Sequence, residues 1–540
     1  MTGAPAFAVP LRASDGTVLV HDAHVPDGAG VDGRPRVPCV ITRTPYGRAR
    51  HLEEGRAWRE RGLAYVVQDV RGRHDSDGTW APYRGERADG AALVDWVAAQ
   101  PWSDGRVVAY GGSYSGCTAW AMAVERPAVV RAVVSLGPSM SLARTKFGGG
   151  GILRLAEHAS WWLERGDART SRDGLAALVF RERPGILRHL PVVDLPQALG
   201  AHLPSWRRIV EDGPGAVTGE EITPDELAAL PAATLHVGGW HDLLLPETLA
   251  HHRVTGSSVP GTPAHLLVGP WEHDLAGSAS GRVGDLDHGD DAVIPWGRML
   301  VDWIRAALDG DLPPRRAEVH VRGSGWEEHD DWPPPHTATR VEWTAGGELS
   351  FVHDPRDPRP SRHPGVDRRA LRSRPDAVRA STVPLAAPLR LTGDVAVELT
   401  SASAAPGVDW VARLLACAPD GAEQELAVGE TTVAGPHDGI RVAVPLGPVA
   451  VLVPAGTTLV LELAGADAPR LARNLGGQPD ERCTSTHEAP VRQGVRVDPS
   501  TPLALVLPVA AGAAPAADTV RVGGAPSTDP IAALSPEAAS

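Results

Sequence analysis

The chain of 540 residues is too long for one hydrophobic core, so we expect two or three domains. Its net charge of −14, with a pI near 5.8, argues against nucleic acids and anionic membrane surfaces as partners. A hydrophobic fraction of 42% is ordinary for a globular protein, and no apolar run is long enough to span a membrane.

The first 139 residues are predicted to form an α/β domain. Strand patterns alternate with helical ones, in the order strand 17–26, strand 36–47, helix 53–62, strand 63–72, helix 85–102, which stops at Pro101, and strand 105–112. The runs "LAYVVQDV" and "GRVVAYGG" are mostly apolar, without strict alternation, as in a sheet that is buried on both faces. This alternation favours a largely parallel sheet covered by helices.

The α/β pattern is interrupted and then resumes. Residues 140–225 have helical spacing and many prolines, which indicates a helical insertion. Strands then follow at 233–239 and 264–269, and a helix at 296–310 ends the domain. We therefore predict an α/β core from 1–139 and 226–312, with 140–225 as a separate cap.

The remainder of the chain has the sequence pattern of an all-β domain. From 313 to 510, short alternating runs such as "AEVHVRGSG", "VAVEL" and "TTLVLELAG" are separated by Gly, Pro and Asp, which predicts a β-sandwich. Residues 511–540 are rich in Ala, Pro, Gly and Ser, so we expect a disordered tail. With no basic and apolar leader and no CxxC pair among its four cysteines, the protein is expected to be cytoplasmic and its thiols reduced.

A serine lies between the strand at 105–112 and the helix that follows it. In "GGSYSG" (111–116), glycines allow a sharp turn that exposes the Ser113 hydroxyl near the backbone N–H groups of a helix start. The spacing is not G-x-S-x-G, because Ser115 occupies the position of the second glycine. On this stretch alone, a nucleophile and an ordinary turn are equally compatible, and Ser115 is a rival.

A base and a carboxylate follow in the order that α/β-hydrolase sheets use. Asp242 comes directly after the strand at 233–239, and His273 directly after the strand at 264–269. His241 and Asp274 are neighbours that compete for these roles, and the histidines at 251 and 252 are less suitable because they lie on a helix. The acidic run 285–291 lacks the spacing of a calcium loop, so no metal site is predicted.

Motifs along nearly the whole chain resemble one family. They are "RTPYG" (43–47), "QDVRGRHDSDG" (68–78), "GGSYSG" (111–116), "GGWHD" (238–242), "GPWEH" (269–273), "LTGDVAVEL" (391–399) and "RNLGG" (473–477). The chain resembles the cocaine-esterase-like hydrolases, which are grouped with X-prolyl dipeptidyl-peptidases and α-amino-acid ester hydrolases in the peptidase S15 superfamily. The family signature is G-x-S-Y-x-G, which Gly116 satisfies.

The resemblance implies an α/β-hydrolase core, a helical cap and a C-terminal jelly roll. It implies Ser113 as nucleophile, His273 as base, Asp242 as orienting acid, and an oxyanion hole made by the Tyr46 hydroxyl and the Tyr114 backbone N–H. No cofactor or metal is implied. Asp69 and Arg71 are expected to brace the loop that carries Tyr46.

Substrate preference is predicted from positions where this sequence differs from the family pattern and from the aromatic residues of the cap. Leucines at 243–245 follow Asp242 where amino-acid ester hydrolases carry carboxylates, which favours an uncharged acyl group. Pocket candidates are Trp161, Trp162, Trp206, Leu243 and Leu244, which would suit a hydrophobic or aromatic acyl ester. The prediction is a serine hydrolase of small-molecule esters that works through an acyl-enzyme. Amide or X-prolyl peptide hydrolysis, acyl transfer, an inactive binding protein and the oligomeric state remain open.

Overall fold

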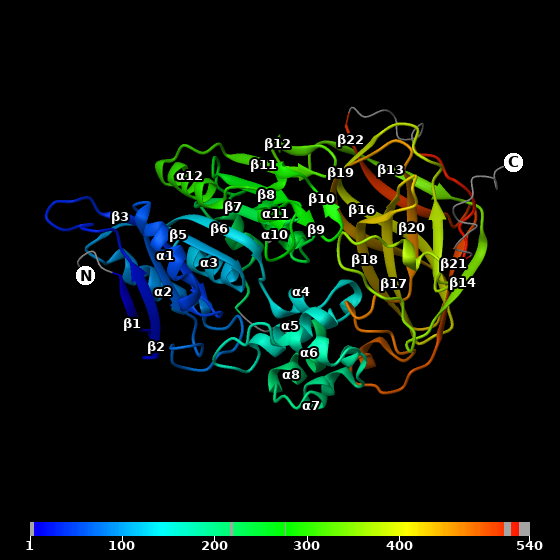
Figure 1. Cartoon of the computed structure of the whole chain (residues 1–540), viewed down its shortest axis with the longest axis horizontal. Helices are drawn as coiled ribbons and strands as arrows, with labels where there is room; N and C mark the ends of the chain where they lie inside the picture. The colour runs from blue at the N-terminus through cyan, green and yellow to red at the C-terminus, as the bar shows by residue number, and fades with distance from the viewer. Residues whose placement is uncertain (1–4, 216–219, 276, 512–519, 529–540) are drawn as a thin grey trace.

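The computed structural model describes residues 5–215, 220–275, 277–511 and 520–528. Figure 1 shows three parts: an α/β core that holds the N-terminus, a group of cap helices below it, and a β-rich part that holds the C-terminus. The two ends of the chain lie at opposite ends of the long axis. Among the described residues, none of the helices is both long and apolar enough to cross a membrane.

The core is built on a ten-stranded sheet in the order β1-β2-β4-β3-β5-β6-β7-β8-β11-β12. Its central strands, from β4 and β3 to β8 and β11, run parallel, whereas β1, β2 and β12 pair antiparallel at the two edges. The strands are β1 Ala6–Arg12, β2 Val18–His24, β3 Val37–Thr44, β4 Ala64–Asp69, β5 Ser103–Ser113, β6 Val130–Pro138, β7 Ala233–Gly239, β8 Ala264–Gly269, β11 Arg315–Val321 and β12 Gly325–His329.

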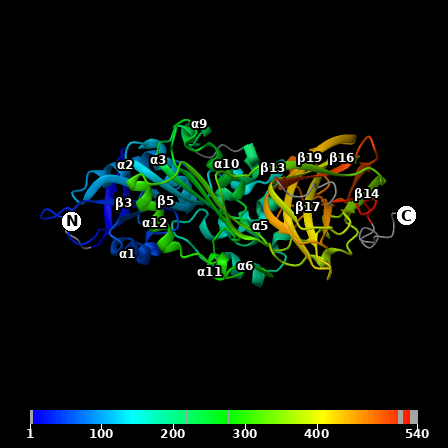
Figure 2. The ribbon, with the colours of Figure 1, turned by 90° about the horizontal axis from the view of Figure 1, so that it is seen from above.

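Helices cover both faces of this sheet (Figure 2). They are α1 Leu52–Glu60, α2 Glu86–Ala98, α3 Tyr114–Glu125, α10 Leu245–Val254 and α12 Trp296–Asp309. Successive strand residues alternate between two apolar layers: Ile41 packs with residues of α2 and α3, whereas Val40 packs with residues of α1 and α12. The alternation explains why the central strands read as continuous apolar runs.

The cap is inserted between β6 and β7. Its helices are α4 Leu142–Lys146, α5 Leu155–Arg165, α6 Leu175–Glu182, α7 Leu195–Ala198, α8 Pro204–Asp212 and α9 Pro224–Ala228. The cap has its own interior, in which the Trp162 indole donates to His158 Nδ1 at 3.0 Å and the Trp206 ring lies 4.4 Å from the His158 ring. It also contacts the C-terminal part, where the Ala472 N–H donates to the Leu153 carbonyl at 2.8 Å.

The C-terminal part is a sandwich of two antiparallel sheets. One contains β13-β22-β16-β21-β14 with β19 beside β16, and the other contains β15-β20-β17-β18. The strands are β13 His336–Trp343, β14 Gly347–His353, β15 Ala377–Ser381, β16 Leu389–Ser403, β17 Gly407–Cys417, β18 Glu423–Ala434, β19 His437–Val453, β20 Thr458–Ala464, β21 Val491–Val497 and β22 Leu503–Ala510. A large apolar cluster that includes Trp343 and Trp410 fills the space between the sheets.

Two details differ from the sequence-based expectation. The strand "AEVHV" was assigned to the sandwich, but β11 pairs parallel with β8 and carries β12 as the edge of the core sheet. The segment β8-α12-β11 is a βαβ crossover, so the core extends beyond residue 312. Within the expected disordered tail, Val520 packs into the sandwich and the Ser527 N–H donates to the Arg379 carbonyl at 2.9 Å, while 512–519 and 529–540 lie outside the described residues.

Candidate active site

Ser113 occupies the turn between β5 and α3. Its backbone has φ 55° and ψ −126°, a conformation that a residue with a side chain rarely adopts and that is held by the surrounding strand and helix. The turn is tight, because a Cβ on Gly111 would lie 2.1 Å from the Ser115 carbonyl oxygen and one on Gly116 would lie 2.9 Å from Pro138. These close approaches explain why both positions are glycine.

Asp242 and His273 meet at the carboxyl ends of β7 and β8. His273 Nδ1 lies 3.0 Å from Asp242 Oδ1 and 3.1 Å from Oδ2. The Asp242 side chain is buried and also accepts the Leu244 N–H at 2.8 Å, so its orientation is fixed. Gly137, at the end of β6, makes room for the pair: a Cβ there would lie 2.5 Å from Asp242 Oδ2.

The carboxylate sets the protonation of the imidazole. Removal from water alone would lower the pKa of His273, but the charge and hydrogen bond of Asp242, with a smaller contribution from Glu157, outweigh it and raise the pKa above the ordinary value. The Nδ1 hydrogen bond to Asp242 leaves Nε2 as the ring nitrogen available to a reacting group.

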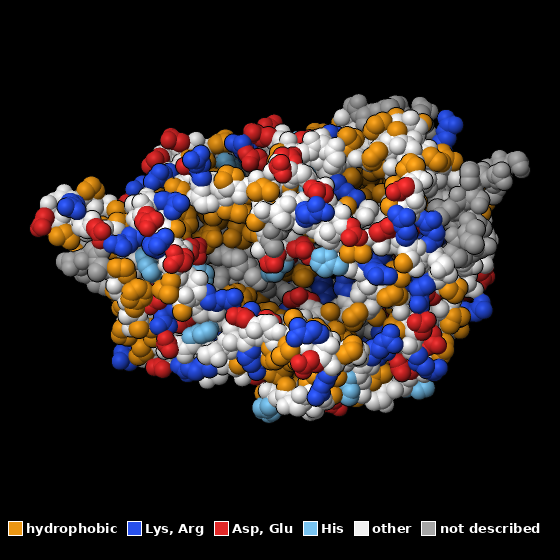
Figure 3. Space-filling view, in the orientation of Figure 1, with side chains coloured by type: hydrophobic (Ala, Val, Ile, Leu, Met, Phe, Trp, Pro, Cys, Tyr) orange, Lys and Arg blue, Asp and Glu red, His pale blue; other side chains and the backbone are white. Residues whose placement is uncertain are grey.

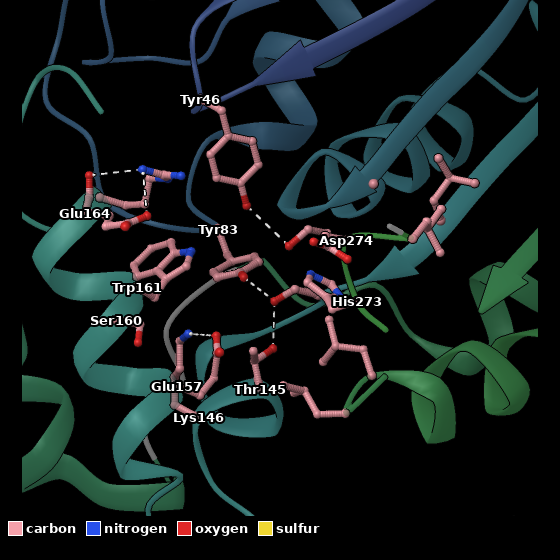
Figure 4. Close-up of a pocket in the computed structure, with 18 of the residues that line it drawn as sticks. Tyr46, Tyr83, Thr145, Lys146, Glu157, Ser160, Trp161, Glu164, His273 and Asp274 are labelled. Carbon is pink, nitrogen blue, oxygen red and sulfur yellow. Dashed lines mark hydrogen bonds and ion pairs between the residues drawn. The ribbon is translucent and has the colours of Figure 1, made fainter. Parts of the chain in front are cut away.

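Tyr46 directs its hydroxyl to the serine. The phenol oxygen lies 3.3 Å from Ser113 Oγ, and the two side chains line the same cavity (Figure 4). The loop of Tyr46 is anchored at both sides, since Arg73 Nε donates to the Pro45 carbonyl at 2.9 Å and the Arg48 N–H donates to Asp69 Oδ1 at 2.8 Å. The contact of Asp69 agrees with its expected bracing role.

Tyr114 follows Ser113 at the start of α3, and its side chain is bonded to other partners. The Tyr114 hydroxyl is buried, donates to Glu86 Oε1 at 2.7 Å and accepts the Tyr83 N–H at 2.7 Å, which directs the ring away from Ser113. Its N–H is the first of α3, and the first N–H groups of a helix have no partner within the helix. This N–H and the Tyr46 hydroxyl are therefore two hydrogen-bond donors next to Ser113.

A cavity of about 550 Å³ opens above these groups, between the core and the cap. Ser113, His273 and Tyr46 line it on the core side, and α5 lines it on the cap side (Figure 4). Figure 3 shows one face of the molecule, which is hollowed near its centre and has charged side chains around the recess.

The cavity separates the predicted pocket residues into two groups. Trp161, Leu243 and Leu244 line it, whereas Trp162 and Trp206 are buried in the interior of the cap and do not reach it. The sequence analysis also missed polar residues of the wall, namely Tyr83, Ser139, Thr145, Lys146, Glu157, Ser160 and Glu164. The helical spacing of Glu157, Ser160, Trp161 and Glu164 places them on one face of α5 and could have identified this wall.

All but one of the rival residues lie outside the cavity. Ser115 is buried in α3 and His241 is half-buried beside His288, and neither lines the cavity of Ser113. His251 and His252 are buried on α10, which packs on β6, β7 and β8, while Asp274 lines the cavity next to His273. Across the described ranges, no group of three or more His, Cys, Asp or Glu side chains is arranged to hold a metal ion. The four cysteines are free and buried.

Two family models match the chain in sequence order. Residues 15–274 match the X-Pro dipeptidyl-peptidase family (S15), and residues 308–499 match the C-terminal non-catalytic domain of X-Pro dipeptidyl-peptidases. The matches together span the core, the cap and most of the sandwich.

Known proteins with similar sequences or structures cover almost the whole chain. A cocaine esterase from Rhodococcus sp. (strain MB1 Bresler) is 27% identical, over 93% of this chain and 97% of the esterase. The crystal structure of an α-amino acid ester hydrolase superposes with a TM-score of 0.80 at 20% identity, over 94% of this chain and 96% of that one. An aminopeptidase from a marine sediment archaeon (Thaumarchaeota) gives 0.76 at 21% identity, with the same coverage. These likenesses confirm the predicted fold: an α/β-hydrolase core with a helical cap and a C-terminal all-β domain.

Proposed function

Because the chain belongs to the S15 family, we propose that it is a serine hydrolase that cleaves small-molecule carboxylic esters through an acyl-enzyme. The observation that carries the proposal is the convergence of Ser113, the Asp242–His273 pair and the Tyr46 hydroxyl at one cavity. The Rhodococcus relative is named an esterase, and this chain matches it over nearly its full length, which supports ester substrates.

The proposed mechanism assigns one role to each group. His273 takes the Ser113 proton as Oγ attacks the ester carbonyl, and Asp242 holds the imidazole in the correct tautomer and stabilises its charged form. The Tyr46 hydroxyl and the Tyr114 N–H donate to the oxyanion of the tetrahedral intermediate. His273 then gives the proton to the leaving alkoxide, and a water activated by the same imidazole releases the acid.

Substrate preference follows from the walls of the cavity. Leu243 and Leu244 come directly after Asp242 and present apolar side chains, while Trp161 provides an aromatic face on the cap side. A wall of this kind favours an uncharged acyl group with hydrophobic or aromatic character. Amide hydrolysis and acyl transfer would use the same catalytic groups, and the resemblance to the archaeal aminopeptidase keeps peptide substrates as the alternative.

The proposal is tested by initial rates on p-nitrophenyl esters of increasing acyl length, a benzoyl ester and an X-Pro p-nitroanilide. The expected result is turnover of the esters by the wild type and almost none by Ser113→Ala. Turnover of the anilide alone would replace the esterase proposal with a peptidase. Product analysis with added alcohols distinguishes hydrolysis from acyl transfer.

A further inference from the structure

Lys146 is the sole lysine of the chain, and it lies in the wall of the catalytic cavity. Its side chain is almost completely buried, at the end of α4, where Nζ donates to Glu157 Oε1 at 3.2 Å and lies 4.8 Å from the centre of the Trp161 ring. All other Lys or Arg positions in this sequence are arginine. The compact ammonium group lies between a carboxylate and an aromatic face.

Glu157 is the partner of the ion pair that a ligand in the cavity can reach. Its side chain is 39% exposed, against 2% for Lys146, and only one of its two carboxylate oxygens accepts from the lysine. Figure 4 shows the pair on the cap side, next to Ser160 and Trp161 and at a distance from Tyr46. A ligand in the cavity therefore meets a carboxylate oxygen that is already charge-compensated from behind.

Two more cations of the wall are paired with carboxylates. The cationic residues of the lining are Arg50, Lys146 and Arg165, and the acidic ones are Glu157, Glu164 and Asp274. Arg50 pairs with Asp173 at 3.2 Å, and Arg165 pairs with both Asp173 and Glu164. A ligand with a net charge would leave water to meet side chains that are already paired, so its own charge would stay uncompensated, which is costly. A neutral hydrogen-bonding group would instead donate to Glu157 without that cost.

We propose that the Lys146–Glu157 pair is a specificity element that selects ester substrates with an uncharged hydrogen-bonding substituent and rejects both cationic and anionic ones. The inference rests on the proposed hydrolase function but concerns selection at the cap side of the cavity. Each partner masks the other: Lys146 neutralises a carboxylate that would bind cations, and Glu157 neutralises an ammonium that would bind anions. Removing one partner exposes the preference of the other.

The test uses four esters that differ in one substituent. They are p-nitrophenyl 3-phenylpropanoate and its para-hydroxy, para-aminomethyl and para-carboxy derivatives, and a second series carries the same substituents on 2-phenylethyl acetate. The measured quantity is kcat/KM for each substituted ester divided by that of the unsubstituted one, so that general losses of activity cancel. The variants are Lys146→Met, Glu157→Gln and the double variant. Arg207→Met and Glu211→Gln remove the same charges from an exposed ion pair of α8 and serve as controls.

In at least one series, we expect the wild type to favour the hydroxy ester and to reject both charged ones. Lys146→Met is expected to raise the ratio for the aminomethyl ester by about tenfold or more, because a hydrogen bond to a charged group is stronger than one between neutral groups. Glu157→Gln is expected to raise the ratio for the carboxy ester by a similar factor for the same reason. The double variant has neither charge, so it is expected to reject the aminomethyl ester and the carboxy ester, as the wild type does. The control variants leave all ratios unchanged.

An unchanged ranking of the charged esters in both single variants and both series overturns the inference. Binding separates this outcome from a failure of the proposed function. The dissociation constants of the matching 3-arylpropanamides are measured by calorimetry in the Ser113→Ala background, which needs no turnover. If the ranking switches there while no ester is hydrolysed by the wild type, the inference stands and the esterase proposal fails.

Discussion

Replacing Tyr46 by phenylalanine removes one hydroxyl and little else. The phenol lies 3.3 Å from Ser113 Oγ, whereas the ring is half-buried with the Arg165 guanidinium 5.5 Å from its centre, a contact that phenylalanine retains. The backbone anchors of the loop involve Pro45 and Arg48 and are not affected. The change therefore tests one donor of the oxyanion hole.

Loss of one such donor costs about 10²–10³ in kcat, or about 2.7–4 kcal/mol. Because the donor acts on the oxyanion and not on the bound ester, kcat and kcat/KM should fall together while KM changes little. The assay is steady-state hydrolysis of a p-nitrophenyl ester, with Tyr83→Phe as the control. Tyr83 lines the same cavity, but its hydroxyl bonds to Ser139 at 2.5 Å and not to Ser113. A Tyr46→Phe enzyme whose kcat/KM stays within about threefold of wild type would refute the assigned role.

Three further predictions concern the carboxylate–imidazole pair, its titration and the stability of the sandwich. Gly137→Ala places a methyl group 2.5 Å from Asp242 Oδ2, so kcat/KM should fall about hundredfold with an unchanged circular dichroism spectrum, and wild-type rates would contradict the geometry. The pKa of His273 is raised above the ordinary 6.5 and only the neutral ring is a base, so kcat/KM should decline as the pH falls through a midpoint above 6.5, and Asp242→Asn should move that midpoint down. Glu462 is buried against three arginines at 2.6–3.7 Å, so Glu462→Gln should lower the free energy of unfolding in denaturant titrations by about 3–5 kcal/mol. The exposed pair of Glu398 should contribute only about 0–1 kcal/mol, and equal losses for the two variants would contradict the burial argument.

The sequence was most informative where topology and chemistry coincide. Parallel strands end at one edge of a sheet, so a serine, an aspartate and a histidine that follow three strands in the hydrolase order are expected to lie close together. The structure places Ser113 and His273 in one cavity and Asp242 against His273. These three side chains could be located because each follows the end of a strand, and the apolar runs of the sequence mark the strand ends well.

The cap was less predictable, because its side chains are placed by tertiary packing. Trp161 and Trp162 are adjacent on α5, and their directions differ by about 100°, so one lines the cavity and the other fills the cap interior. Their identities alone do not distinguish them. The role of Lys146 could not be predicted either, because a sequence that uses arginine almost exclusively gives a single lysine no special meaning. Its importance depends on its buried position beside Glu157, which only the structure shows.

The sequence also did not show to which sheet each strand belongs. The strand of β11 has the same alternating pattern as those of the sandwich, but it pairs with β8. The helix directly before it, α12, was the available signal, since strand–helix–strand units make parallel pairs. For Val520 and its neighbours, composition favoured disorder, and the apolar packing against the sandwich depends on a long-range contact.

The central claim is that Ser113 is the nucleophile, and the most direct measurement is the site of covalent modification by a fluorophosphonate. Intact mass followed by peptide mapping should show one adduct on Ser113 in the wild type and in Ser115→Ala, and none in Ser113→Ala. An adduct on Ser115, or one that persists in Ser113→Ala, would contradict the account of this site.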